Sequence, residues 1–274
     1  MITRSEVLAS SFEPESGLRA MLTSSVDVER YAADGFVIVR GLFSPAEIAE
    51  ASAEADRLFA RRDLIDSKNL RCRWQNHYQS GECRFDAFDP VIDLSPMTDQ
   101  LAHDARILAA VGDLYGEDAF LFKDKLIFKP PGATGYGLHQ DYIAWESFPK
   151  SYVTVLVPID AADEENGCTE IFPGYHNSGY LSPDDGNYHE LPLPAIDESK
   201  GVKLFLSPGD IAIFGCMTPH RSAPNRSQMW RRQLYLSYNS GSDGGDQREA
   251  HYSEFRTWLK GKYAEFGKHD TYFA

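Results

Sequence analysis

The second half of the chain alternates short apolar runs with turns rich in glycine, proline, aspartate and asparagine. The runs lie in AFLFKDKLIFK, SYVTVLVPID, CTEIFPG, GVKLFLSPGDIAIFG and RRQLYLSYNS. Short apolar or alternating runs separated by such turns are typical of antiparallel sandwiches and barrels. The pattern therefore predicts a mainly β protein, with a β core over about residues 118–240 and helices outside it.

The first part of the chain carries mostly helical patterns. Residues 25–34 indicate a short helix, and Phe36–Val39 indicates a strand. Ser44 stands where an N-cap is expected, Pro45 at the first helical position, and Glu47 three residues after the cap, as in a capping box. Further helices are expected in MTDQLAHDARILAAVGDLYG and in HYSEFRTWLKGKYAEF.

Residues 61–90 have no clean hydrophobic period and are polar, basic and aromatic together. A segment of this length without regular structure is more often functional or mobile than inert. Two interpretations stay open: an exposed loop, or a lid with polar contacts to a small substrate. The side chains available for such contacts are Arg71, Arg73, Asn76, His77 and Tyr78.

Composition and charge narrow the classes of molecule that the protein is expected to bind. The 274 residues include 42% hydrophobic residues, enough for one large core, and neither a repeat nor a linker divides them, so we expect a single domain over 1–274. A formal net charge of −14 disfavours nucleic acid and anionic membranes as partners. No apolar run reaches the ~18 residues of a transmembrane helix, and the start of the chain lacks the apolar core of a signal peptide. These features predict a cytoplasmic protein with free cysteine thiols and a small-molecule substrate.

Three residues have the character of metal ligands. His139 and Asp141 flank one residue, and side chains two apart on a strand share a face, so one ion could meet both. This tripeptide alone is a weak signal, since polar residues also occupy solvated strand faces. His220 emerges from the later apolar run IAIF. Two histidines and one carboxylate with open coordination positions suit non-haem Fe(II) and O₂ chemistry.

A candidate site for a cosubstrate follows the third ligand. Arg231 comes eleven residues after His220 and just before an apolar strand, so its guanidinium could clamp a carboxylate inside the fold. 2-Oxoglutarate chelates iron through its keto-acid end and needs such a clamp for its far carboxylate. Ser222 lies in the same stretch and could add a hydroxyl donor.

Four segments, FKPPGATGYGLHQD, EENGCTEIFPGYH, SPGDIAIF and HRSAPNRSQMWRR, together with YAADGFVIVRGLFSPAEIAE, resemble the phytanoyl-CoA dioxygenase family. The resemblance extends from about residue 29 to 240. It implies a double-stranded β-helix (a cupin-like jelly roll), Fe(II), and 2-oxoglutarate and O₂ as cosubstrates. It also implies iron ligation by His139, Asp141 and His220, and 2-oxoglutarate binding by Arg231 and Ser222.

Two details refine what the resemblance implies. Asp141 is a carboxylate where halogenating relatives have alanine or glycine, so hydroxylation is expected rather than chlorination. Some members carry a tryptophan on the strand after the H-x-D motif, whereas this strand reads YVTVLVPI. Thr154 is therefore the expected 2-oxoglutarate contact on it.

Candidate substrate residues lie around the motif. Alternation puts Lys123 and Lys125 on one strand face and Asp124 on the other, either on a solvated strand or facing the pocket of an anionic substrate. Similar positions in ectoine hydroxylase favour the pocket. Trp145 is a candidate core or pocket-wall residue, and Asn76 and His77 are candidate polar contacts to the substrate if residues 61–90 form a lid. We expect a structural role for His176, and surface or capping roles for the histidines outside the triad, namely His77, His103, His189, His251 and His269.

The substrate is narrowed by similarity to the bacterial branch that includes ectoine hydroxylase-like and aminoalkylphosphonate-oxidising enzymes. A small zwitterion such as 2-aminoethylphosphonate or its N-methylated form suits lysines together with aromatic residues. The alternatives are a tailoring hydroxylase of a natural product or amino-acid derivative, and a jelly-roll binding module without catalysis. Desaturation or cyclisation instead of hydroxylation, and a homodimer instead of a monomer, stay open.

Overall fold

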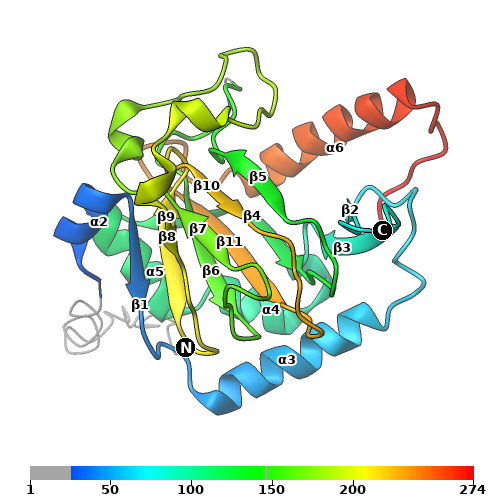
Figure 1. The fold of residues 1–274 in the computed structure, drawn as a ribbon, viewed down its shortest axis with the longest axis horizontal. Coiled ribbons are helices and arrows are strands. Elements are labelled where there is room, and N and C mark those ends of the chain that lie inside the picture. The colour runs from blue at the N-terminus through cyan, green and yellow to red at the C-terminus, as the bar shows by residue number, and fades with distance from the viewer. Residues whose placement is uncertain (1–25, 146) are drawn as a thin grey trace, which may run out of the picture.

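The fold consists of two antiparallel sheets packed face to face, with helices on the outer face of the larger one (Figure 1). The computed structural model describes residues 26–145 and 147–274, so the expectations for the start of the chain lie outside the described residues. The larger sheet has the order β1-β9-β6-β11-β4-β3-β2, and the smaller β5-β10-β7-β8. The strands are β1 Phe36–Val39, β2 Cys72–Asn76, β3 Cys83–Phe88, β4 Ala119–Ile127, β5 Tyr136–His139, β6 Val153–Pro158, β7 Thr169–Ile171, β8 Val202–Lys203, β9 Ile211–Gly215, β10 His220–Ser222 and β11 Gln233–Ser240.

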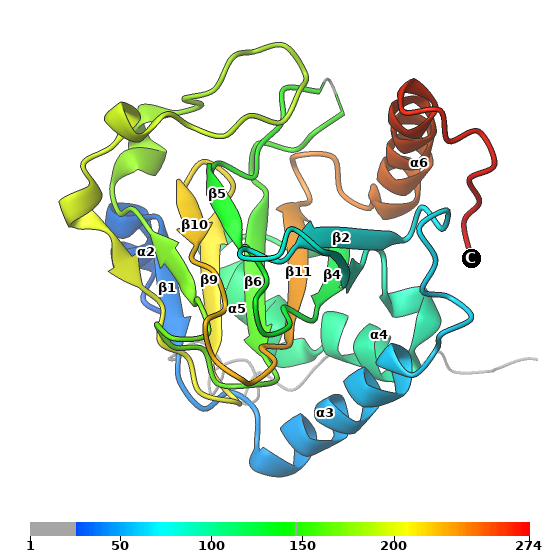
Figure 2. The same cartoon turned by 45° about the vertical axis from the view of Figure 1, so that its right-hand side comes forward.

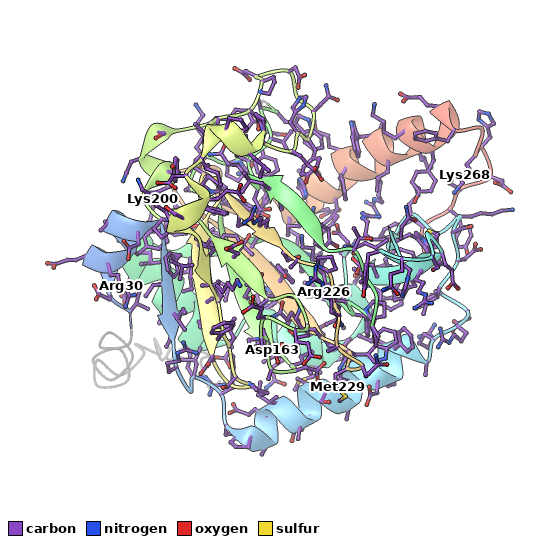
Figure 3. All side chains as sticks on the ribbon, viewed as in Figure 1. Arg30, Asp163, Lys200, Arg226, Met229 and Lys268 are labelled. Carbon is purple, nitrogen blue, oxygen red and sulfur yellow. The ribbon has the colours of Figure 1, made fainter. Side chains whose placement is uncertain are left out.

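The apolar runs predicted as strands form the centre of this sandwich. Every residue of β6 is buried: Val155 and Val157 pack toward the helices, and Leu156 packs between the sheets. Successive side chains of a strand point to opposite faces of the sheet. A strand that is covered on both faces is therefore a continuous apolar run. Burying each such side chain contributes roughly 1.5–3 kcal/mol. Side chains fill the space between the two sheets (Figure 3).

Five α-helices flank the sheets in the described part of the chain. They are α2 Val28–Asp34, α3 Pro45–Phe59, α4 Pro96–Ala102, α5 Ala105–Tyr115 and α6 Arg248–Glu265. Short 3₁₀ turns occur at Ile92–Leu94, Tyr175–Ser178, Leu193–Ala195 and Glu198–Lys200. The start of α3 is the predicted capping box, since Ser44 Oγ accepts from Glu47 N at 3.3 Å and the Glu47 carboxylate accepts from Ser44 N at 2.7 Å. No described helix has the length and hydropathy of a membrane span.

The single helix predicted in MTDQLAHDARILAAVGDLYG is wrong. The chain leaves helical geometry after Ala102 and starts again at Ala105. Asp104 takes an extended conformation and accepts a hydrogen bond from Arg106 N at 2.9 Å, so it acts as a new N-cap.

The expectation that residues 61–90 lack regular structure is also wrong. Strands β2 and β3 form a hairpin that completes one edge of the larger sheet, so the sheet extends beyond the predicted core of 118–240. Strand β2 is mostly half-buried, so its sequence lacks a clean apolar alternation. Arg71 is buried and forms two hydrogen bonds of 2.7 Å to the Asp93 carboxylate, which is a structural role.

Helix α6 is fixed to the larger sheet through Asp124. This carboxylate is 0% exposed; it accepts from Val91 N at 2.6 Å, Ile92 N at 2.8 Å and Arg248 Nε at 2.7 Å. The Tyr252 hydroxyl bonds the Asp124 backbone at both its N and its O. The interpretation of β4 as a solvated strand is therefore wrong, and α6 lies at the same end of the sheets as the loop over residues 174–200 (Figures 1 and 2).

Replacing Asp124 should destabilise the protein strongly. Asp124→Ala leaves the Arg248 guanidinium and two backbone N–H groups without their acceptor, which should lower the free energy of unfolding by about 3–5 kcal/mol. Urea denaturation measures this as a lower midpoint with an unchanged slope. Asp118→Ala, at an exposed position before β4, is the matched control and should change stability by less than about 0.5 kcal/mol. Equal midpoints for the two variants would contradict the assignment.

Candidate metal centre

Strand pairing brings the three predicted ligands together. His139 ends β5, Asp141 follows two residues later, and His220 begins β10. In the antiparallel pair of β5 and β10, His220 stands directly opposite His139. Ligand atoms of His139, Asp141 and His220 all lie within 4.8 Å of one another. The register of this strand pair thus brings together residues that lie far apart in the sequence, without the help of a special loop.

Backbone carbonyls orient both imidazoles. His139 Nδ1 lies 2.8 Å from Gly137 O, and His220 Nδ1 lies 3.0 Å from Thr218 O. A carbonyl only accepts, so Nδ1 carries the proton in each ring and Nε2 keeps its lone pair. The two Nε2 atoms face Asp141 Oδ1 at 3.6 Å and 3.7 Å. Both imidazoles therefore present the nitrogen that binds a metal.

The charge states also suit a cation. Burial, and next the adjacent His139, lower the pKa of His220 to about 4, so its imidazole is neutral near neutral pH. Burial raises the pKa of Asp141, but His220 and His139 lower it more, so the carboxyl stays ionised. Two imidazoles and one carboxylate form the donor set that Fe(II) takes in oxygenases, with further positions left for ligands.

Two neighbouring side chains hold this geometry. Thr154 on β6, predicted as a 2-oxoglutarate contact, donates its hydroxyl to Asp141 Oδ2 at 2.9 Å. Gln140, between the two ligands, faces the other way: its Nε2 donates to Met217 O at 2.7 Å and Gly179 O at 2.8 Å. Gln140 thus ties β5 to the turn before His220 and to the start of the loop over 174–200.

Arg231 has the properties of a carboxylate clamp. It is 0% exposed, and its Nη1 donates to Gly167 O. Its Nε and Nη2 have no hydrogen-bond partner among the described residues. Leaving guanidinium donors buried and unpaired is costly, and paired guanidinium donors match the two oxygens of a carboxylate. This observation fits the far carboxylate of 2-oxoglutarate.

Lys129 supports the clamp and was not identified from the sequence. Its buried ammonium donates to Gly167 O at 2.8 Å, Ser222 Oγ at 3.1 Å and Ala223 O at 2.5 Å. Ser222 Oγ also accepts from Tyr136 N at 3.2 Å, so its own proton is free to donate to a ligand. A lysine inside the apolar run before Pro130 was the available signal.

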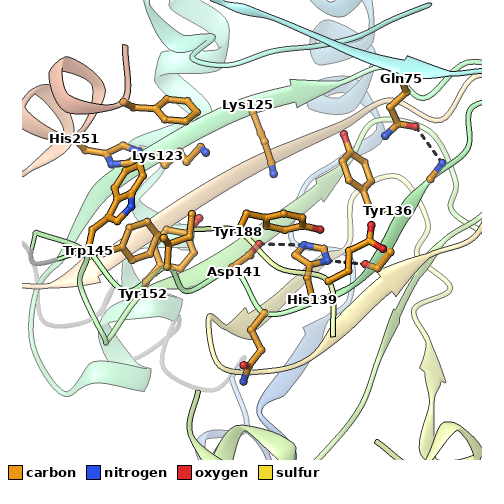
Figure 4. Close-up of a pocket in the computed structure, with 17 residues that line it drawn as sticks. Gln75, Lys123, Lys125, Tyr136, His139, Asp141, Trp145, Tyr152, Tyr188 and His251 are labelled. Carbon is orange, nitrogen blue, oxygen red and sulfur yellow. Dashed lines mark hydrogen bonds and ion pairs between the residues drawn. The ribbon is translucent and has the colours of Figure 1, made fainter. Parts of the chain in front are cut away.

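Two cavities share the ligands His139 and Asp141 in their walls, and Figure 4 shows the larger one. The larger has a volume of about 400 Å³, and the other is a narrow slot of about 30 Å³. Residues lining both are Lys125, Tyr136, His139 and Asp141. The slot alone adds Ile127, Thr169, His220, Arg221, Ser222 and Tyr235, and the larger cavity adds Gln75, Lys123, Trp145, Phe148, Tyr152, Tyr188, Glu190, His251 and Phe255, among others.

The structure sorts the predicted substrate residues. Lys123, Lys125 and Trp145 line the larger cavity, as predicted. Asn76 and His77 do not line this cavity, so the prediction of these two residues as substrate contacts is wrong. Asn76 is exposed at the end of β2, and His77 packs against Gly132, where an added Cβ would lie 1.9 Å from the ring. The lining residue from this strand is Gln75.

The histidines outside the triad occupy several kinds of position. His103, His189 and His269 are exposed or half-buried and lie outside the triad. His176 has the predicted structural role, because it contacts Ala32 O at 3.1 Å and fills the space beside Gly35. The prediction of a surface role for His251 is wrong: it is 5% exposed and lines the larger cavity. Its spacing of four from Phe255 on a predicted helix was the missed signal.

The Thr154 hydroxyl should tune metal affinity. Thr154→Val keeps the shape but removes the donor to Asp141, so Fe(II) affinity should fall about 10- to 100-fold. An anaerobic Fe(II) titration measures this directly. Thr257→Val, on the exposed side of α6, is the matched control and should bind iron as the unmodified chain does. Unchanged affinity in Thr154→Val would remove Thr154 from the centre.

Arg231 should govern the affinity for 2-oxoglutarate. Arg231→Lys keeps the charge but loses the paired donors, so KM for 2-oxoglutarate should rise about 10- to 100-fold. Succinate formation at varied 2-oxoglutarate concentration gives the value, and a thermal melt checks folding. The control is Arg226→Lys, an exposed arginine of the same segment labelled in Figure 3. A wild-type KM in a folded Arg231→Lys variant would contradict the clamp.

Comparison with known proteins places the chain among oxygenases. The phytanoyl-CoA dioxygenase family model matches residues 31–233. Methylphosphonate hydroxylase of Gimesia maris is 38% identical over 157 residues, 57% of this chain and 59% of that protein, so the chain spans less than two thirds of it. 2-Aminoethylphosphonate dioxygenase of an uncultured bacterium, HF130_AEPn_1, is 31% identical over 220 residues, 77% of this chain and 79% of that protein.

Solved structures confirm the fold. The epimerase SnoN in complex with Fe³⁺, α-ketoglutarate and nogalamycin RO superposes with a TM-score of 0.65 at 23% identity, covering 81% of this chain and 84% of its own. EctD from S. alaskensis gives a TM-score of 0.64 at 21% identity, covering 81% and 78%. The predicted jelly roll and the predicted enzyme class, a dioxygenase, are confirmed, and the three predicted ligands lie together. The chain belongs to the phytanoyl-CoA dioxygenase family.

Proposed function

We propose that the protein is an Fe(II)- and 2-oxoglutarate-dependent hydroxylase of a small polar anion or zwitterion, with 2-aminoethylphosphonate or its N-methylated form as the favoured substrate. One observation carries the proposal. His139, Asp141 and His220 meet between a slot lined by Ser222 and a cavity whose wall carries two lysines; Lys129 links Ser222 to the Gly167 carbonyl that buried Arg231 also binds, and two donors of that guanidinium have no partner among the described residues. One side suits a dicarboxylate, and the other suits a substrate with an anionic group.

In this proposal each residue around the centre has a defined task. His139, Asp141 and His220 hold iron, which with 2-oxoglutarate and O₂ supplies the oxidation of a C–H bond with release of succinate and CO₂. Arg231 and Ser222 bind the far carboxylate of 2-oxoglutarate, and Thr154 orients Asp141. The protein contributes position and exclusion of water rather than bond chemistry of its own.

The larger cavity favours an anionic substrate. Among residues 26–145 and 147–274, the Lys125 ammonium forms neither a hydrogen bond nor an ion pair; it lies 5.0 Å from the Tyr235 ring centre and, in Figure 4, points toward Asp141. Lys123 lies 3.4 Å from Asp89 Oδ2. Two lysines on one wall attract a phosphonate, which two similar proteins are named for. Glu190 on the rim offers a counter-charge for a substrate ammonium.

The alternatives are less well supported. A tailoring enzyme for a large apolar natural product would need a less charged wall than one with Lys123 and Lys125. A binding module without catalysis would not need a complete triad with correctly oriented Nε2 atoms.

We also propose that residues 1–274 act as one catalytic domain in the cytoplasm.

A succinate-release screen tests the function. The protein with Fe(II), 2-oxoglutarate and O₂ is offered 2-aminoethylphosphonate, its N-methylated form, methylphosphonate, betaines, amino acids and acyl thioesters. We expect an aminophosphonate to give succinate and hydroxylated product in equal amounts. His220→Ala should abolish both products and the visible band that forms when Fe(II) and 2-oxoglutarate bind without oxygen. His103→Ala, at an exposed histidine, should change neither. Turnover of other compounds but of no phosphonate would refute the substrate assignment.

A further inference from the structure

We infer that helix α6 supplies a specificity residue to the substrate cavity: His251, a neutral imidazole that donates a hydrogen bond to the oxyanion of the substrate beside Lys123 and Lys125. The inference rests on the proposed function and extends it to a region beyond the family match, which ends at residue 233. In Figure 4 His251, Lys123 and Trp145 cluster at one end of the cavity, and Asp141 and His139 lie nearer its middle.

The first argument is hydrogen bonding. His251 is 5% exposed, its Nε2 has no partner among the described residues, and no hydrogen bond of its ring to them is found. Its ring packs against Phe122 with centroids 4.2 Å apart, and against Phe255 at 5.7 Å in a stacked arrangement. A phenylalanine would fill such an aromatic environment without an unpaired polar group. An imidazole here therefore implies a ligand that pairs with it.

The second argument is charge. Burial lowers the pKa of His251 to about 3, with a further contribution from the Lys123 ammonium, so the ring is neutral near neutral pH. The other charged groups near it are Asp89 and Arg248, and both are already paired within the protein. His251 thus adds a directional N–H next to a cation, without adding charge.

The third argument is rigidity. Arg248 and Tyr252 fix the first turns of α6 to Asp124, and His251 lies between them. The segment after the helix is also attached, since the backbone of Tyr272 bonds to Lys68 and Leu70, and Arg71 contacts Phe273 and Ala274. The first turns of the helix, which carry His251, are therefore fixed, and the imidazole is positioned before a ligand arrives.

The geometry indicates the kind of oxyanion. Lys123, Lys125 and His251 are three donors that line the same cavity. A phosphonate offers three oxygens and two negative charges, whereas a carboxylate offers two oxygens and one charge. Three donors therefore favour a phosphonate, and removing the imidazole should reduce the preference for it over a carboxylate of equal length.

The test compares His251→Phe with His251→Gln. The phenylalanine variant keeps the aromatic packing and loses the donor, so KM for 2-aminoethylphosphonate should rise about 10- to 100-fold while kcat and KM for 2-oxoglutarate stay near wild type. The ratio of kcat/KM for 2-aminoethylphosphonate to that for 3-aminopropanoate should fall by a similar factor. His251→Gln restores a donor and should recover part of the loss. Lys260→Gln, exposed on α6, is the control.

A binding measurement separates this inference from the proposed function. Calorimetric titration of metal-free protein with methylphosphonate should give an affinity about 10-fold or more weaker in His251→Phe, with an unchanged melting temperature or a raised one. If the wild type binds methylphosphonate through His251 but turns over no phosphonate, the proposed function fails and the oxyanion site stands. If His251→Phe retains wild-type affinity and the wild-type kcat/KM ratio, or if the wild type neither binds nor oxidises a phosphonate, the inference is wrong.

Discussion

The register between β5 and β10 is the constraint on which the centre depends. Pairing His220 opposite His139 sets the separation of the two imidazoles, and the residue two beyond His139 then brings its carboxylate to the same point. A slip of one residue would turn each side chain to the other sheet face and dissolve the centre. Gln140 acts against such a slip, because its side chain bonds across to the Met217 carbonyl just before β10.

The protein buries an unusual number of charged side chains near this pair of strands. Arg231 and Lys129 lie close together in the interior, and burial lowers the pKa of Lys129 well below its ordinary value. The nearby Asp86 carboxyl accepts from the Tyr136 hydroxyl. Such a group of charges contributes little to folding by itself. It is readily understood as a site prepared for a dianion, whose arrival pairs donors that the protein leaves open.

Much of this could be predicted from the sequence, because the relevant signals are local or carried by motifs. Strand runs, the capping box at Ser44, the triad and Arg231 all follow from spacing and residue type. The predictions that failed concern features that depend on tertiary contacts. The hairpin over β2 and β3 has a half-buried edge and so no clean period. Whether Gln75 or Asn76 faces the cavity depends on strand phase, and the role of His251 depends on where α6 docks, which Asp124 decides.

Lys125 lines both cavities, and this has a thermodynamic consequence. One ammonium lies within reach of two anionic ligands, so each ligand changes the electrostatic potential that the other meets. Binding free energies linked in this way are reciprocal: whatever the cosubstrate does to the affinity for the substrate, the substrate does to the affinity for the cosubstrate. A single side chain at the junction thereby makes the affinity for each ligand a property of the pair of ligands rather than of either one.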